Sequence, residues 1–121
     1  MTQCKKNQKY YAARILKIKN QKQIKKITQE ITVMRDLSTT HVVRYHCTFQ
    51  HKDLLFMFIE HMKKGCLTDF IIKCQRNKTK ISEDIMAYIL KQILLGLKSV
   101  HEKQQIHRDI KSDNVLIGEN G

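Results

Sequence analysis

The first part of the chain passes from an alternating to a helical spacing of apolar residues. Residues 9–19 are rich in aromatic and β-branched side chains, which is typical of a strand. On such a strand Ala12 and Arg14 share one face, and Lys17 lies on the other. Residues 22–37 are predicted to form a helix, because apolar residues recur there at intervals of three or four. These residues are Ile24, Ile27, Ile31 and Met34.

A β-hairpin is predicted next. Residues 42–49 alternate, and four of them are expected on one face of a strand. These four are Val43, Tyr45, Cys47 and Phe49. Residues 50–53 supply a polar turn, and residues 54–59 form a continuous apolar run. Such a run is expected of a central strand that is covered on both faces.

The second part of the chain contains a long amphipathic helix. Gly65 marks a break in local structure before it. Ser82 is the predicted N-cap, and the acids that follow it complement the helix dipole. The apolar stripe is broad, so it is expected to be buried in a larger body. Its members are Ile85, Met86, Ile89, Leu90, Ile93, Leu94, Leu97 and Val100.

Residues 106–117 form a polar loop with apolar flanks. Asp109 and Asn114 are close enough in sequence for their side chains to converge, with Lys111 between them. A proton-accepting carboxylate, a phosphate-binding cation and an amide oxygen for a metal are what phosphoryl transfer needs. The alternative is a polar turn in which Ser112 or Asp113 is a local cap.

The string I-H-R-D-I-K-S-D-N-V-L resembles the catalytic loop H-R-D-L-x-x-x-N of eukaryotic protein kinases. It is closest to the PAK-type branch of the sterile-twenty group, and a Lys two residues after the Asp resembles serine/threonine kinases. The resemblance implies that Asp109 orients the substrate hydroxyl and accepts its proton. It further implies that Lys111 lies against the transferred phosphoryl group and that Asn114 holds Mg²⁺.

The resemblance also implies a nucleotide site on the first strand. Tyr11-Ala12-Ala13-Arg14 resembles the kinase pattern V-A-I-K, so Ala12 would line the adenine site. Arg14 then stands where a Lys is expected, and its planar fork differs from a point-like ammonium. Lys17 is the alternative phosphate anchor.

The predicted helix at 22–37 resembles the kinase helix whose Glu pairs with the Lys of the preceding strand. Glu30 lies on its apolar stripe, so we expect Glu30 to be buried and paired with a cation. Arg14 is the partner that the resemblance implies. Lys26, four residues away on the same helix, is the alternative partner.

Residues 60–70, E-H-M-K-K-G-C-L-T-D-F, resemble the kinase hinge. The resemblance implies that Ile59 lies behind the adenine and that backbone groups of Glu60 and Met62 bond to its edge. Asp69 would lie near the ribose, and its alternative is an ordinary acid at a helix N-terminus. Leu116 is the remaining nucleotide-binding position that the resemblance implies.

We therefore expect an α+β, protein-kinase-like fold, with an antiparallel β small lobe carrying one helix and the first helices of a mainly helical large lobe. Residues 1–59 would be the small-lobe part, 60–65 the hinge and 66–121 the start of the large lobe. The chain contains neither G-x-G-x-x-G nor D-F-G, so a domain truncated at both ends is expected. Residues 115–117 would then expose an unpaired edge before the turn signal Asn120-Gly121, and the long helix would lack most of its cover.

The chain carries 23 basic and 11 acidic residues, for a net charge of +12. Such a balance can indicate nucleic acid or an anionic membrane surface. We favour a solvated basic face, since no groove-reading motif is present. No apolar segment approaches the roughly 18 residues of a membrane span, and no signal-peptide core is seen. A cytoplasmic location is expected, and the four cysteines lack zinc or disulfide spacing.

The sequence thus predicts a partial serine/threonine kinase domain. It would use ATP and Mg²⁺ to phosphorylate protein Ser/Thr hydroxyls in signalling, with a protein substrate and a regulatory protein partner. Because of Arg14 and the missing D-F-G, weak or absent activity is expected of this chain. The alternative is a pseudokinase-type module that binds proteins without catalysis.

Overall fold

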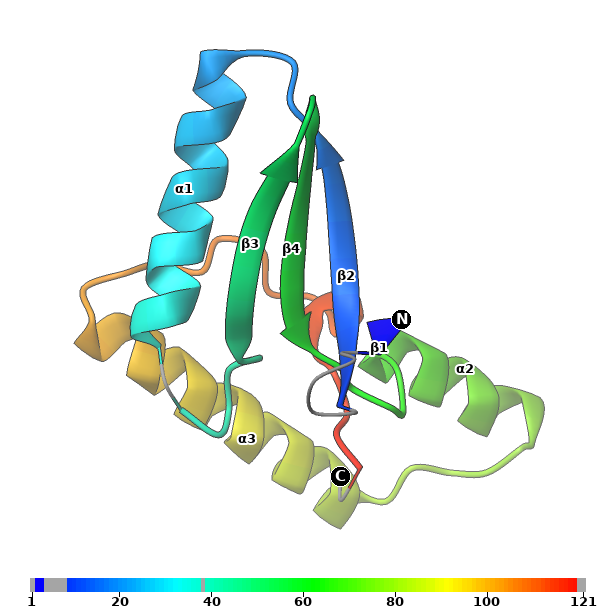
Figure 1. Ribbon diagram of the computed structural model, residues 1–121. Helices are drawn as coiled ribbons and strands as arrows, with labels where there is room; N and C mark the ends of the chain where they lie inside the picture. The colour runs from blue at the N-terminus through cyan, green and yellow to red at the C-terminus, as the bar shows by residue number, and fades with distance from the viewer. Residues whose placement is uncertain (1, 4–8, 38, 120–121) are drawn as a thin grey trace. The chain divides into compact units, whose positions relative to one another are not determined.

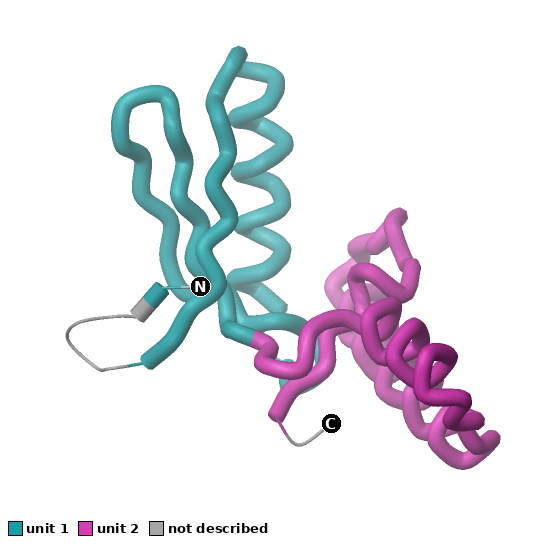
Figure 2. The backbone as a smooth tube through the Cα atoms, turned by 90° about the vertical axis from the view of Figure 1, so that its right-hand side faces the viewer, with its two compact units in different colours: residues 1–61 teal, residues 62–121 magenta. Residues whose placement is uncertain are grey.

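The protein is described by a computed structural model that covers residues 2–3, 9–37 and 39–119 (Figure 1). The chain is divided into two compact units, residues 1–61 and residues 62–121 (Figure 2). The expected hinge at residues 60–65 stays a prediction.

Over its described residues, the first unit is an antiparallel sheet with one helix beside it (Figure 1). Its strands follow the order β1-β2-β4-β3, so β4 is central, as its continuous apolar run predicted. The elements are β1 (Thr2–Gln3), β2 (Tyr10–Lys17), α1 (Gln21–Asp36), β3 (Tyr45–His51) and β4 (Leu54–Glu60). The strand, helix and hairpin expected from the sequence are confirmed, and β1 was not expected. The hairpin turn is shorter than predicted, with Lys52 in the left-handed region at φ 54°.

The core of this unit is small and centres on Met57, which is 1% exposed. Met57 lies opposite Arg14 of β2 and Thr48 of β3. Ile27 of α1 and Leu37 after it are also buried. Asn20 begins α1 as its N-cap, since its side-chain oxygen accepts from the Gln23 N–H at 2.9 Å. The helix therefore begins at a side-chain cap and buries Ile27 of its predicted apolar stripe, whereas Ile24 is 42% exposed.

A β-bulge corrects the predicted faces of β3. Pairing passes from Tyr45 opposite Ile59 directly to Cys47 opposite Phe58, so the residue between them is extra. Because one extra residue reverses the alternation, Tyr45 lies on one face and Cys47 on the other. The expectation that Tyr45, Cys47 and Phe49 share a face was wrong.

The outer face of the sheet is also more open than predicted. Phe49 stacks on Phe56 and Phe58, with ring centroids 4.9 and 5.5 Å apart. Phe49 is nevertheless 50% exposed, and Ile15, opposite Phe56 on the next strand, is 57% exposed. The prediction of a central strand covered on both faces was wrong for this face, because α1 is the one helix among the described residues of this unit.

The second unit contains α2 (Leu67–Arg76), α3 (Glu83–Glu102) and the 3₁₀ turn η1 (Ser112–Asn114). Ser82 caps α3 as predicted, and its hydroxyl accepts from the Ile85 N–H at 3.4 Å. Much of the α3 stripe is uncovered, as expected of a truncated large lobe, since Leu94 is 64% exposed while Val100 is buried. Within the described residues, no helix has both the length and the apolar character needed to span a bilayer.

The segment after η1 pairs along one side with the chain that enters α2, and the unpaired edge expected at residues 115–117 stays a prediction for its other side. The Leu67 N–H donates to Val115 O at 2.8 Å, and the Ile117 N–H donates to Gly65 O at 2.9 Å. This pairing ties the end of the polar loop to the start of α2. The predicted turn at Asn120-Gly121 lies outside the described residues.

Gly65 is the break that the sequence predicted, and its backbone lies in the left-handed region at φ +78°. A Cβ at this position would lie 3.1 Å from the Asp69 carboxylate. Glycine is favoured there for both conformational and steric reasons.

We expect Met57→Ala to lower the free energy of unfolding by about 2–5 kcal/mol, because it leaves a cavity in a core with few other members. Urea unfolding followed by circular dichroism measures this change. The matched control is Ile15→Ala on the neighbouring strand, whose side chain is more than half exposed. A Met57→Ala loss no larger than that of the control would contradict this account of the core.

Candidate active site

The polar loop leaves α3 through a strained stretch of backbone. Arg108 lies in the left-handed region at φ 63°, which is uncommon for a residue with a Cβ. Next to it, the Asp109 N–H donates to the His107 imidazole Nδ1 at 3.3 Å. Strained residues of this kind gather at functional sites. Here the strain lies directly before the predicted catalytic carboxylate.

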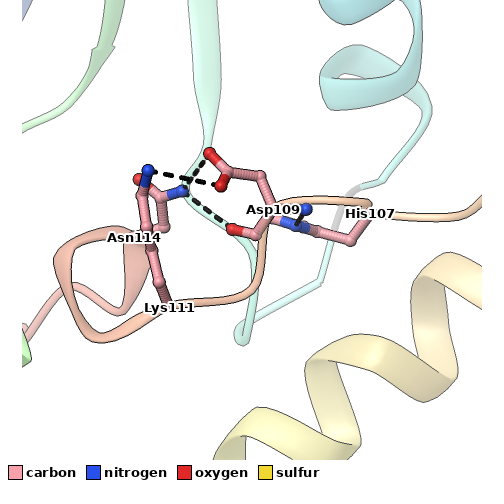
Figure 3. Close-up of polar contacts among 4 residues, drawn as sticks. All are labelled: His107, Asp109, Lys111 and Asn114. Atoms are coloured by element: carbon pink, nitrogen blue, oxygen red, sulfur yellow. Dashed lines mark hydrogen bonds and ion pairs between the residues drawn. The ribbon is translucent and has the colours of Figure 1, made fainter.

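Asp109, Lys111 and Asn114 come together on this loop (Figure 3). The Asn114 side-chain amide donates to both the backbone oxygen and the Oδ2 of Asp109, each at 2.8 Å. Lys111 Nζ lies 3.2 Å from Asp109 Oδ1. Both carboxylate oxygens therefore have a donor, and hydrogen bonds to an ionised acceptor are among the stronger ones. The geometry gathers a carboxylate, an ammonium and an amide, as the sequence predicted.

These contacts favour the charged form of the carboxylate. The Asn114 hydrogen bond, and after it the Lys111 ammonium, holds the pKa of the Asp109 carboxyl below its ordinary value of 3.8. Asp109 is thus ionised at neutral pH and can accept a hydrogen bond from a substrate hydroxyl. Because Asn114 uses its NH₂ group, its carbonyl oxygen remains for other partners. Carboxylate and amide oxygens are ligands that Mg²⁺ accepts, so the loop fits this ion.

The alternative of a simple capped turn is not supported. Residues 112–114 do form a 3₁₀ turn, but no side chain caps it. Ser112 instead contacts α2, because the Thr68 hydroxyl donates to Ser112 Oγ at 2.8 Å. The sequence did not predict this contact, because its two residues are far apart in the chain and lie in two separate motifs.

In the first unit, three of the residues expected around a nucleotide, Ala12, Arg14 and Ile59, share one face of the sheet. Ala12 lies directly opposite Ile59, and Arg14 follows on the same face of β2. Arg14 forms an ion pair with Glu30 of α1, with Nη1 and Oε1 2.5 Å apart. The alternative pair with Lys26 is absent among the described residues. The structure therefore contains the cross-element contact that the resemblance implied.

Two details of this pair matter. The Glu30 side chain is 42% exposed and that of Arg14 is 51% exposed, so the expectation of a buried Glu30 was wrong. An exposed pair contributes about 1 kcal/mol or less to stability. Lys17, the alternative anchor, lies on the other face and contacts Asp53 at 3.4 Å.

The other four positions expected around the nucleotide make local contacts. The Glu60 carboxylate accepts from the Arg44 N–H at 3.3 Å, and Met62 O accepts from the Gly65 N–H at 3.3 Å. Asp69 accepts from the backbone N–H of Cys66 at 3.4 Å, at the start of α2. This contact is the one expected of an acid in the first turn of a helix. Leu116 forms an isolated bridge with Cys66.

Comparison with known proteins gives the family. A profile described as the protein kinase domain matches residues 1–121. Serine/threonine-protein kinase pakB of Dictyostelium discoideum is 37% identical over 102 residues, which are 84% of this chain and 12% of that protein. Serine/threonine-protein kinase pakA of the same organism is 36% identical over 110 residues, 91% of this chain and 9% of that protein. Serine/threonine-protein kinase pak-1 of Caenorhabditis elegans is 34% identical over 110 residues, 91% of this chain and 18% of that protein.

The chain therefore belongs to the protein kinase domain family, an enzyme family. Its relatives are PAK-type serine/threonine kinases, which confirms the resemblance to the sterile-twenty group. The chain spans 9 to 18% of the length of these three relatives. The α+β kinase fold expected from the sequence is confirmed as well.

We expect Asn114→Leu to raise the pKa of Asp109 toward its ordinary value, because the largest cause of the lowered pKa is lost. The sign follows from linkage: a lowered folded-state pKa gives stability above the ordinary pKa, which is lost as the pH falls through the folded-state pKa. Titration of the Asp109 carboxyl by NMR measures the shift.

The control for this substitution is Asn77→Leu, which removes an amide from the end of α2. It should leave the Asp109 titration unchanged. An equal shift in both variants would mean that the Asn114 hydrogen bond does not set the pKa of Asp109.

Proposed function

We propose that this chain provides the catalytic loop and part of the nucleotide site of a protein serine/threonine kinase. Kinases of this family generally use ATP and Mg²⁺ and act on protein substrates. The proposed reaction moves the γ-phosphoryl group of ATP to a Ser or Thr hydroxyl of a protein, leaving ADP. The mutual contact of Asp109, Lys111 and Asn114 is the observation that carries this proposal.

Each residue of the loop has a role in the proposed transfer. Asp109 orients the hydroxyl whose oxygen attacks the γ-phosphorus, and it accepts the hydroxyl proton as the bond to the ADP oxygen breaks. Lys111 stabilises negative charge on the transferred group. Asn114 holds Mg²⁺ through its side-chain oxygen, and the ion when bound neutralises charge on the phosphates.

The nucleotide positions belong to the same proposal. Ala12 and Ile59 line the adenine, and backbone groups of Glu60 and Met62 bond to its edge. Asp69 lies near the ribose. Leu116 contacts the base. Residues 60–65 are the proposed hinge between a small-lobe part at 1–59 and the start of the large lobe at 66–121.

Arg14 is proposed as the phosphate anchor, held by Glu30. Its exposed ion pair with Glu30 supports this role. An Arg presents a planar fork, which fits phosphates differently from a Lys ammonium. We therefore propose weak transfer by this chain. A cytoplasmic location, a regulatory protein partner and the absence of nucleic acid among the partners complete the proposal.

The second candidate function is a pseudokinase-type module that holds a protein partner without catalysis. Arg14 in place of Lys favours it. Intact Asp109, Lys111 and Asn114 favour the enzyme. The two candidates differ in whether the chain transfers phosphate.

We expect slow transfer of radiolabelled phosphate from Mg-ATP to a generic Ser/Thr protein substrate, with Asp109→Asn as the inactive control. Isothermal titration with Mg-ATP should also show binding. Transfer at typical kinase rates, roughly 1–100 per second, would contradict weak activity. Binding without any Asp109-dependent transfer would favour the pseudokinase candidate. Absence of both binding and transfer would refute the proposed nucleotide site.

We expect Arg14→Lys to raise the transfer rate about tenfold, because it restores a point-like ammonium at the phosphate anchor. The same phosphate-transfer assay measures the change. Lys17→Arg is the matched control, since this residue contacts Asp53 on the other face of β2. A rate that falls with Arg14→Lys, or rises equally in the control, would rule out Arg14 as the anchor.

A further inference from the structure

The catalytic loop is held in place by the start of α2, which lies outside the loop motif. Its last residues pair with the chain that enters α2, through Leu67 N–H to Val115 O and Ile117 N–H to Gly65 O. Closer to the reacting groups, the Thr68 hydroxyl in the first turn of α2 donates to Ser112 Oγ at 2.8 Å. The start of α2 therefore holds the loop both by backbone pairing and by a side-chain hydrogen bond.

Ser112 is well placed to transmit that contact. It lies directly after Lys111, and the turn it begins closes with Asn114 N–H to Lys111 O at 3.0 Å and Val115 N–H to Ser112 O at 3.3 Å. Moving Ser112 would thus move both Lys111 and Asn114. Asp109 would follow, because its two carboxylate oxygens are bound by these same side chains.

Packing alone does not fix the three reactive side chains. Asp109, Lys111 and Asn114 are all exposed, whereas Thr68 and Ser112 are partly buried. Exposed side chains that bond mainly to one another can turn as a group, so their position must be set by a contact outside the group. The Thr68–Ser112 hydrogen bond is such a contact.

The anchor at Thr68 is itself well fixed. Asp69 accepts from the Cys66 N–H and thiol, at 3.4 and 3.2 Å, and so closes the first turn of α2 around Thr68. Gly65, in its left-handed conformation, sets the direction from which the chain enters this turn. A hydroxyl on a capped first turn of a helix is held in a more fixed position than a hydroxyl on a loop.

We propose that Thr68 is a positioning residue for the phosphoryl-transfer reaction and acts through Ser112. This proposal rests on the proposed function, since it concerns the placement of the same three groups. Thr68 does not touch the reacting atoms. Its hydroxyl holds the 3₁₀ turn at a set distance from α2, so that Lys111 and Asn114 meet Asp109 in the geometry that transfer needs.

The test is Thr68→Val, which keeps the shape of the side chain and removes the hydroxyl. A neutral hydrogen bond of about 1 kcal/mol corresponds to roughly fivefold in rate. We expect kcat for phosphate transfer to fall about fivefold, with KM for Mg-ATP changed less than twofold. Thr68→Ser, which retains the hydroxyl, should restore kcat.

A second measurement does not depend on activity. Hydrogen exchange followed by NMR should become faster at the backbone amides of Asn114 and Val115 in Thr68→Val, while the amides of α3 keep their protection. Thr79→Val is the matched control, because the Thr79 side chain is exposed and lies beyond the end of α2. It should change neither kcat nor exchange in the loop.

The outcomes separate the two proposals. Unchanged kcat in Thr68→Val, or faster exchange throughout α3 with no recovery in Thr68→Ser, would overturn the positioning role and leave the kinase function standing. Absence of both transfer and Mg-ATP binding in the unsubstituted chain would instead refute the proposed function itself. Faster loop exchange together with the selective loss of kcat would support Thr68 as the positioning residue.

Discussion

The Asp109 carboxylate and its two donors are the interaction on which the functional interpretation depends. Asn114 binds one oxygen and Lys111 approaches the other, within a loop of six residues from Asp109 to Asn114. This arrangement keeps the acid ionised without burying it. A buried, unpaired carboxylate would be costly, whereas an exposed one with two donors is charged, oriented and open to a substrate. The left-handed backbone at Arg108 helps to direct the Asp109 side chain.

The charged side chains of the two units are held in position by different kinds of backbone structure. In the first, the sheet supplies the order: cross-strand pairing sets Ala12 against Ile59 and leaves Arg14 free to reach Glu30 on α1. In the second, irregular backbone supplies the order, through a 3₁₀ turn, an isolated bridge and a hydroxyl pair. The ion pair can be exposed, because strand pairing holds the backbone of Arg14 in place whether or not the pair adds stability.

Sequence reasoning predicted what depends on local pattern. The helices, the hairpin and the loop motif follow from spacing of apolar residues and from one ordered string, and the family comparison confirms the kinase fold. It failed where one residue changes a whole face, as the bulge before Cys47 does, and where burial depends on neighbours, as for Glu30. It also missed the Thr68–Ser112 contact, because only the folded chain brings α2 and the loop together.

Gly65 illustrates how much one small residue can carry. Its N–H bonds to Met62 O, its carbonyl accepts from the Ile117 N–H, and its bare Cα leaves room for the Asp69 carboxylate. Three neighbourhoods therefore share a single position: the segment entering α2, the first turn of that helix and the strand-like end of the loop. Replacing this glycine would disturb all three at once. Evolution could not adjust any one of them through this position alone, so variation between homologous chains should be accommodated at the residues around it.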